Sequence, residues 1–123
     1  LEVEFLIGKM GAGKEPALKT NIGVTAQALW HMDVILKNTI KVRCFNHIVA
    51  VPTPEAYAIH KIIINGERGK KAEKDARAVN NLLPLLNEEK LTKTFGSLSK
   101  KEKARVRTFA ETPGVAARIL GSI

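Results

Sequence analysis

Several residue types are scarce in this chain of 123 residues, and each shortage excludes a class of protein. A single cysteine, Cys44, excludes an internal disulfide framework and is typical of a reducing compartment. Aromatic residues make up 5% of the chain, which disfavours recognition of single-stranded RNA by base stacking. No apolar run is long enough to cross a bilayer. We therefore expect a cytoplasmic protein with no membrane partner.

The residues that are plentiful indicate a folded, basic protein. Apolar residues make up 45% of the chain, enough for one core in one ordinary domain. The net charge of +8 favours anionic partners such as nucleotides, RNA or DNA. The sequence starts without methionine inside a strand-like run, so we expect residues 1–123 to be a single domain or a fragment, the alternative being a chain cleaved from a tag.

The hydrophobic patterns predict an α+β fold, with a small mixed or antiparallel sheet followed by helices. Alternation of apolar residues predicts a strand over residues 1–7, and two β-rich runs around Phe45-Asn46 predict a hairpin over residues 40–51. We read residues 8–21 as an exposed loop and leave 24–38 open between helix and strand. Residues 1–52 would form the sheet part, and residues 53–123 the helical part.

Capping residues and breakers set the expected helices in the second part. Thr53-Pro54-Glu55 predicts the start of a helix over residues 54–65, which Gly66 ends. A second helix is expected over residues 70–88, with Pro84 kinking or ending it. Ser97 or Ser99 would cap a third helix over residues 99–111.

The stretch from Gly8 to Lys14 reads G-x-x-x-x-G-K and imitates the start of a phosphate-binding P-loop. A working P-loop has Ser or Thr after the lysine to hold Mg²⁺, but this chain has Glu15, followed by Pro16. The carboxylate would repel phosphate, and no amphipathic helix follows to point its N-terminus at a ligand. We interpret the stretch as a loop and not as a P-loop.

Glu2 and Glu4 lie on one face of the first predicted strand, about 7 Å apart along it. Two interpretations are open. The pair can form an ordinary solvated strand face, or it can hold a metal ion at a sheet edge together with substrate phosphates.

Asp75 lies among the apolar positions of the second predicted helix. A carboxylate there needs a cationic partner because burying it alone is costly, and Lys61 and Arg68 are the natural candidates. Such a pair can be purely structural or part of a catalytic site. His31, His47 and His60 show no metal-ligand spacing, and Cys44 has no recognisable nucleophile setting.

The sequence resembles the C-terminal part of a family of uncharacterised bacterial proteins with a nucleotidyltransferase fold, related to DNA polymerase β-like and antitoxin-linked nucleotidyltransferases. The resemblance covers residues 1–90, in the order LEVEFLI, GVTAQALWHMDVILKN, VPTPEAYAIHKIIINGER and KKAEKDARAVNNLL. Its most specific parts are VEFL, VPTPEAYAIHK and the spacing from Arg68 to Asp75.

The resemblance implies Mg²⁺-dependent transfer of a nucleoside monophosphate from a nucleoside triphosphate to a hydroxyl, with RNA and protein both open as acceptors. Such enzymes use a D-x-D pair on one strand and a third carboxylate on a neighbouring strand. Val3-Glu4-Phe5 matches the third-carboxylate pattern, so the resemblance assigns the catalytic, metal-binding role to Glu4, with Glu2 as the fallback. Nucleotide contacts fall to Lys61, Arg68 and Lys74, and Asp75 forms a structural ion pair.

One departure separates the sequence from that pattern. Asp33 and Asp75 are its only aspartates, so it contains no D-x-D pair. We expect the first two metal carboxylates to precede Leu1, and we expect residues 1–123 alone to be inactive in transfer. The alternative is a non-catalytic module that binds RNA or a protein through the basic segments 61–74 and 90–107.

Overall fold

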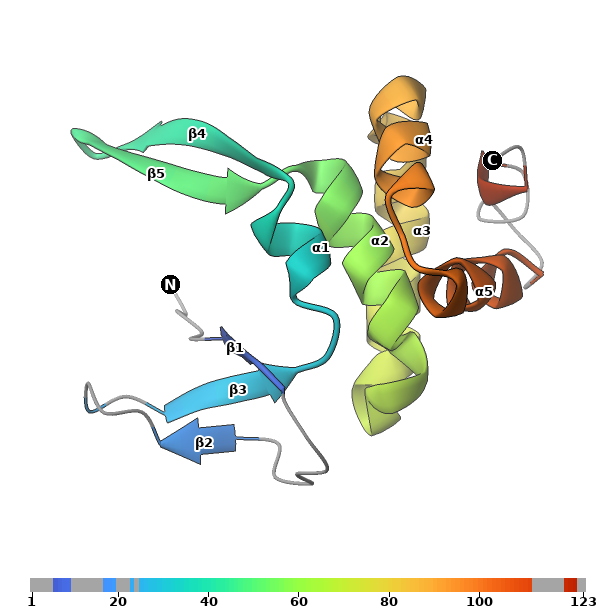
Figure 1. The fold of residues 1–123 in the computed structure, drawn as a ribbon, viewed down its shortest axis with the longest axis horizontal. Coiled ribbons are helices and arrows are strands. Elements are labelled where there is room, and N and C mark those ends of the chain that lie inside the picture. Colours follow the sequence, from blue (N-terminus) through green and yellow to red (C-terminus); the bar gives the residue numbers. More distant parts are fainter. Residues whose placement is uncertain (1–5, 10–16, 20–22, 24, 112–118, 122–123) are drawn as a thin grey trace. The chain divides into compact units, whose positions relative to one another are not determined.

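The computed structural model describes residues 6–9, 17–19, 23, 25–111 and 119–121. They belong to two compact units, Leu1–Met32 and Asp33–Ile123, which are described separately (Figure 1). Both strands and helices are present, and the predicted α+β class is confirmed. None of the helices in the described ranges combines the length and apolar character needed to span a bilayer.

The first unit contains a three-stranded sheet in the order β1-β3-β2. Its strands are β1 (Leu6–Gly8), β2 (Ala17–Lys19) and β3 (Thr25–Leu29). The central strand β3 runs parallel to β1 and antiparallel to β2, and the Lys9 amide extends the sheet by donating to the Leu29 carbonyl over 2.7 Å. The expected strand over residues 1–7 is described only from Leu6 onward.

Two sequence interpretations change in this unit. The prediction of a loop over residues 8–21 is wrong for Ala17–Lys19, because β3 supplies hydrogen-bond partners that a charged, glycine-rich segment does not reveal by itself. The ambiguous segment 24–38 contains both types of structure. Strand β3 comes first, and the four-residue helix α1 (Asp33–Leu36) opens the second unit.

The predicted hairpin is confirmed, as β4 (Thr39–Cys44) and β5 (His47–Pro52) pair antiparallel. Phe45 and Asn46 form its turn with φ of 50° and 59°, the left-handed pair that a two-residue hairpin turn requires. The Thr53 amide donates to the Asn38 carbonyl over 2.8 Å, and the Asn38 side chain donates to the Val34 carbonyl over 2.7 Å. These two bonds fix the base of the hairpin to α1 and to the start of the next helix.

The expected helix over residues 54–65 is confirmed as α2 (Pro54–Ile64). The Thr53 side chain caps it by accepting from the Ala56 amide over 3.1 Å. Gly66 does not end the chain's helical path at once, because the 3₁₀ turns η1 (Asn65–Glu67) and η2 (Gly69–Lys71) follow and lead into α3. Gly69 has φ of 56°, which glycine adopts without strain.

The prediction of one helix over residues 70–88 is wrong at its end. Helix α3 (Ala72–Leu82) stops early, and Pro84 lies in the 3₁₀ turn η3 (Leu83–Leu85). A helix that the sequence analysis did not include, α4 (Glu88–Gly96), then begins, with Asn87 accepting from the Lys90 amide over 2.9 Å. The physical reason is local: proline disfavours a continuous helix, and Asn87 offers a new N-cap three residues later.

The expected helix over residues 99–111 is confirmed as α5 (Lys100–Ala110). Ser99, one of two candidate caps, forms a capping box: its hydroxyl accepts from the Glu102 amide, and the Glu102 carboxylate accepts from the Ser99 amide. A short helical segment is also described at Ile119–Leu120.

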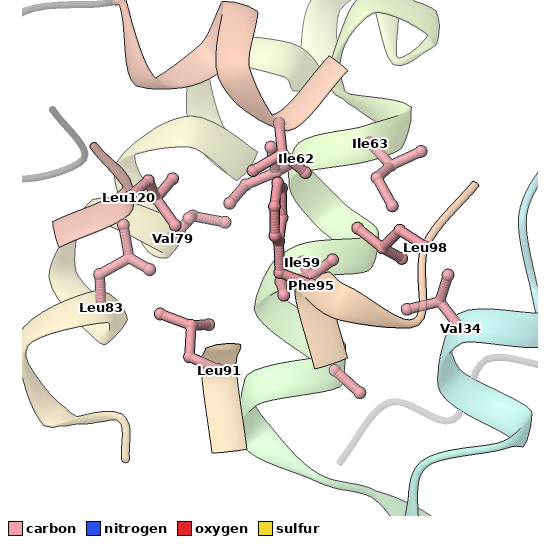
Figure 2. Close-up of a cluster of buried hydrophobic side chains, with 12 residues drawn as sticks. Val34, Ile59, Ile62, Ile63, Val79, Leu83, Leu91, Phe95, Leu98 and Leu120 are labelled. Atoms are coloured by element: carbon pink, nitrogen blue, oxygen red, sulfur yellow. The ribbon is translucent and has the colours of Figure 1, made fainter. Parts of the chain in front are cut away.

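The core of the second unit lies where α2 meets α3, α4 and α5 (Figure 2). Helix α2 is central because its apolar residues are buried almost all round, as in a helix enclosed by others. The core residues are Val34, Ala56, Ile59, Ile62, Ile63, Val79, Leu83, Leu91, Phe95, Leu98, Val106 and Leu120. This packing fixes the ends of α2 and α3, which carry the charged groups described next.

Candidate functional site

The carboxylates proposed to bind metal, Glu2 and Glu4, lie outside the described residues. Within the described ranges, no group of three histidine, cysteine, aspartate or glutamate side chains is close enough to hold a metal ion.

The stretch that imitates a P-loop is described only at its start. Gly8 ends β1, and Lys9 extends the sheet through its amide. The Lys9 ammonium lies 5.4 Å from the centre of the Trp30 ring, within cation–π range. Residues 10–16, which include Glu15 and Pro16, lie outside the described ranges.

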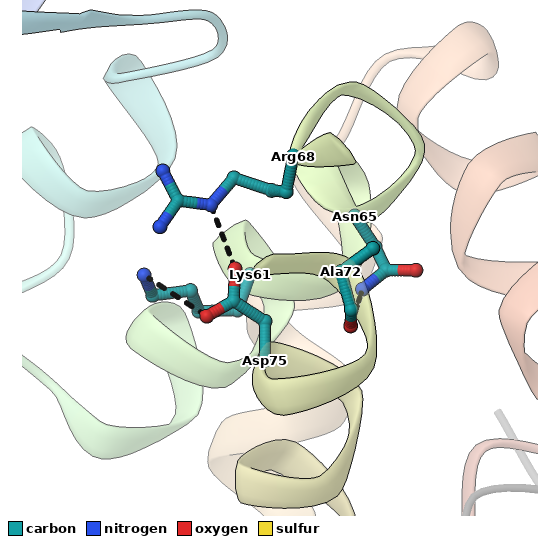
Figure 3. A network of polar contacts seen from close by, with 5 residues as sticks. All are labelled: Lys61, Asn65, Arg68, Ala72 and Asp75. Carbon is teal, nitrogen blue, oxygen red and sulfur yellow. Dashed lines mark hydrogen bonds and ion pairs between the residues drawn. The ribbon is translucent and has the colours of Figure 1, made fainter. Parts of the chain in front are cut away.

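The described cluster with the most distinctive chemistry consists of Lys61, Arg68 and Asp75, and we call it the ionic cluster (Figure 3). The Nε of Arg68 donates to Asp75 Oδ2 over 2.7 Å. The Nζ of Lys61 lies 3.9 Å from Asp75 Oδ1. The side chains of Arg68, Asp75 and Lys61 are 9%, 12% and 19% exposed, so the charges are largely removed from water.

Consecutive elements from α2 to α3 bring these groups together. Lys61 lies near the end of α2, Arg68 lies between the two 3₁₀ turns, and Asp75 lies in the first turn of α3. The Asn65 side chain donates to the Ala72 carbonyl over 2.8 Å and so ties the end of α2 to the start of α3 (Figure 3). The tight connection folds the chain back on itself, which places residues 14 positions apart in sequence in contact.

The ionic cluster has two cations and one carboxylate, so it carries a net charge of +1 among its own members. Arg68 uses its Nε for Asp75, which leaves the two terminal guanidinium nitrogens for another acceptor. In Figure 3 those nitrogens and the Lys61 ammonium lie on the same side of Asp75. The arrangement can receive an anion such as a phosphate, with Asp75 holding both cations in position.

The structure does not bring every proposed site residue into this cluster. Lys74 lies on the exposed surface of α3, and the described contacts give it no place among Lys61, Arg68 and Asp75. His60 is buried in α2, whereas His47 and Cys44 are exposed where the hairpin strands meet the turn. His31 is half-buried with φ of 60° and belongs to the first unit.

A second feature of the same unit is a cavity of about 540 Å³ beside the end of α2, η1 and α5. Ile62, Ile63 and Phe109 give it apolar walls, and Lys101 and Arg105 give it polar ones. Arg105 donates to Glu67 over 3.0 Å and to the Ile63 carbonyl over 3.1 Å, so its charge is already balanced. No sequence signal singled out Arg105, because its partners lie about 40 residues earlier.

Comparison with known proteins gives one positive result. A family model described as Nucleotidyltransferase matches residues 1–116. No curated protein and no solved structure matches the chain. The matched range includes the ionic cluster, the hairpin and the helices that form the core.

Proposed function

This chain belongs to a nucleotidyltransferase family, and from that premise we propose that it takes part in transferring a nucleoside monophosphate from a nucleoside triphosphate to a hydroxyl acceptor. In this proposal the ionic cluster binds the triphosphate. The observation that carries it is the pair of cations, Lys61 and Arg68, brought together beside one carboxylate in a largely buried position.

The geometry supports binding of phosphate more than acid–base chemistry. Asp75 accepts from Arg68 at 2.7 Å and is mostly buried, so it is engaged in positioning a cation. A guanidinium fixed in this way presents its terminal nitrogens without first losing side-chain freedom, which lowers the cost of binding an anion. The contribution of the cluster to transfer is then positioning and charge stabilisation, without a covalent intermediate.

The proposal assigns the metal ion to carboxylates outside the described ranges. Glu4 is the proposed ligand, with Glu2 as the fallback, and Mg²⁺ is the proposed ion because it combines carboxylates with substrate phosphates. When bound, the metal would neutralise charge on the transferring phosphate. Because the sequence has no D-x-D pair, we propose that the two remaining carboxylates are encoded before Leu1.

The triphosphate site can be tested by calorimetric titration of the chain with each of the four ribonucleoside triphosphates. We expect Lys61→Gln to weaken binding about 10-fold, because one charge-assisted contact is lost. Lys71→Gln is the matched control, since it removes the same charge from an exposed position in η2 next to the cluster.

Equal losses in the two variants would show that only net charge matters and would contradict the cluster as a site. Thermal unfolding of both variants is measured in parallel, and the affinities are compared only between folded proteins. Binding by the original chain with no change in Lys61→Gln would also contradict the assignment.

The metal assignment needs a separate measurement. In the protein extended to include the residues encoded upstream, we expect Glu4→Gln to abolish transfer from a labelled triphosphate while Glu2→Gln retains it. The triphosphate titration of Glu4→Gln should change less than that of Lys61→Gln. Full transfer by Glu4→Gln would overturn the role of Glu4 without affecting the triphosphate site.

A further inference from the structure

The hairpin β4–β5 extends away from the helices of its own unit and ends in a turn at Phe45-Asn46 (Figure 1). Its base is fixed by the backbone bond between Thr53 and Asn38, so the strands project from a defined point. A two-stranded ribbon is marginal by itself, and an exposed one requires a reason for its presence.

The strand register defines two different faces of the hairpin. Residues directly opposite in an antiparallel pair point to the same side, and successive residues alternate. One side, the basic face, consists of Lys41, Arg43, Ile48 and Ala50, and the other, the apolar face, consists of Ile40, Val42, Val49 and Val51. The basic face is exposed throughout, whereas Val42 and Val51 on the apolar face are half-buried.

The charges of the hairpin have one sign. The sequence contains no acidic residue between Asp33 and Glu55. Within the described part of the chain, no carboxylate pairs with Lys41 or Arg43. These two cations therefore differ from Lys61 and Arg68, which share Asp75, and they are available to an anionic partner.

The turn carries a second unusual feature. Phe45 is 88% exposed and has φ of 50°. Asparagine and glycine are the usual residues in such a turn, because a side chain such as phenylalanine is strained in the left-handed region. The ring gains no burial in the described structure to offset this cost, and strain of this kind is concentrated at functional positions.

We infer that the hairpin β4–β5 binds a single-stranded nucleic acid, with the Phe45 ring stacking on a base and Lys41 and Arg43 contacting phosphates. Single strands are bound by a basic surface that follows the backbone together with aromatic side chains on which bases stack. An acidic protein would use the two cations but would not require a ring at the tip. The ring beside a face whose only charges are cationic therefore favours the nucleic acid.

The inference does not depend on nucleotidyl transfer, and its test contains neither triphosphate nor Mg²⁺. Fluorescence anisotropy of a labelled 12-nucleotide RNA of mixed sequence measures the affinity of the full chain at several salt concentrations. The double variant Lys41→Gln/Arg43→Gln should bind at least 10-fold more weakly. Its salt slope should fall by about 1.4, since two phosphate contacts are lost from a single strand.

The control Lys100→Gln/Lys101→Gln makes the same change in net charge on the exposed start of α5. It should change the affinity less than 3-fold. Equal losses in the two double variants would overturn the inference, since binding would then follow net charge or the surface of α5. Absence of binding by the original chain at 50 mM salt would also overturn it.

Two substitutions of Phe45 test the ring. Phe45→Asn suits the left-handed turn but removes the ring, and we expect about a 10-fold loss of affinity. Phe45→Trp keeps a stacking surface and should bind at least as well as the original chain. Unchanged binding by Phe45→Asn would overturn the inference, as would equal competition by poly-glutamate or equal affinity for a duplex of the same sequence.

Discussion

The hairpin β4–β5 and the helical region around α2 and α3 contain similar kinds of residues in opposite circumstances. Isoleucine is 68% exposed at position 48 in the hairpin but fully buried at position 59 in α2. The cations of the hairpin have no carboxylate partner in the described structure, whereas Lys61 and Arg68 share Asp75. In the helical region the apolar side chains are buried and the cations are paired within the protein. In the hairpin the same kinds of side chain are exposed to solvent and can contact a partner.

Counting charges along a sequence therefore does not locate a binding surface. Segment 61–74 was one of two basic segments expected to bind RNA or a protein, but its two largely buried cations are held by Asp75. The hairpin has fewer cations than that segment, and both of them, Lys41 and Arg43, are exposed. Whether a charged side chain can bind a ligand depends on the residues that already contact it, and the fold determines which residues those are.

The largest expected difference concerns the apolar residues. Ile59→Ala should lower the free energy of unfolding by about 3–4 kcal/mol, because it opens a cavity in a fully buried position. Ile48→Ala should change it by less than about 0.5 kcal/mol, because the side chain is already in water. Urea denaturation followed by circular dichroism measures both. A large loss in Ile48→Ala would show that the hairpin packs against something, and the contrast would fail.

The next largest effect concerns the ionic cluster. Asp75→Asn should destabilise the protein by about 2–4 kcal/mol, because two largely buried cations lose their counter-charge. Glu73→Gln on the same helix breaks the exposed pair with Arg77 and should cost less than about 0.5 kcal/mol. The loss in Asp75→Asn should persist at 0.5 M salt, since buried pairs are weakly screened. Equal values for the two variants would make the cluster an ordinary surface pair.

A smaller effect is expected at Arg105. Arg105→Ala removes the contacts with Glu67 and the Ile63 carbonyl, and we expect a loss of about 1–2 kcal/mol. Lys101→Ala on the same helix is the control, because its side chain is exposed and it forms no ion pair in the described residues. Chemical denaturation of both variants compares them, and an Arg105→Ala protein as stable as the control would contradict the role of this contact.

The smallest effect is expected at the tip of the hairpin. Phe45→Asn should change the unfolding free energy by less than about 0.5 kcal/mol, because the ring is exposed and asparagine accepts the left-handed backbone. The melting temperature of this variant is the measurement. A loss above about 1 kcal/mol would mean that the ring stabilises the fold. The strained turn would then not support a contact between the ring and a base.

Much of the fold follows from local signals in the sequence. The hairpin, the start of α2 at Thr53-Pro54 and the cap of α5 at Ser99 depend on turn and capping chemistry that neighbouring residues determine. The elements that the sequence did not predict, β2 and α4, depend on neighbouring parts of the structure. Strand β2 forms because β3 lies beside it, and α4 begins because the chain restarts at Asn87 after η3.

The candidate site was partly accessible from the sequence for the same reason. The position of Asp75 among apolar residues predicted a cationic partner, and both Lys61 and Arg68 lie next to it. The exposure of Phe45 was not accessible, because a composition of 5% aromatic residues says nothing about which ring is in water. A low aromatic content disfavoured base stacking, yet one exposed ring at the end of a basic ribbon is enough to provide it.

The contact between Arg105 and the Ile63 carbonyl also has a consequence for the order of folding. It joins residues 42 positions apart, and it closes the end of α2 with a side chain from α5. During synthesis, α2 and α3 leave the ribosome well before Arg105 does. The contact between Arg105 and the last turn of α2 therefore forms late. Contacts of this range slow folding because a long loop must close first. The neighbourhood of the ionic cluster thereby becomes rigid only after α5 has packed against the end of α2.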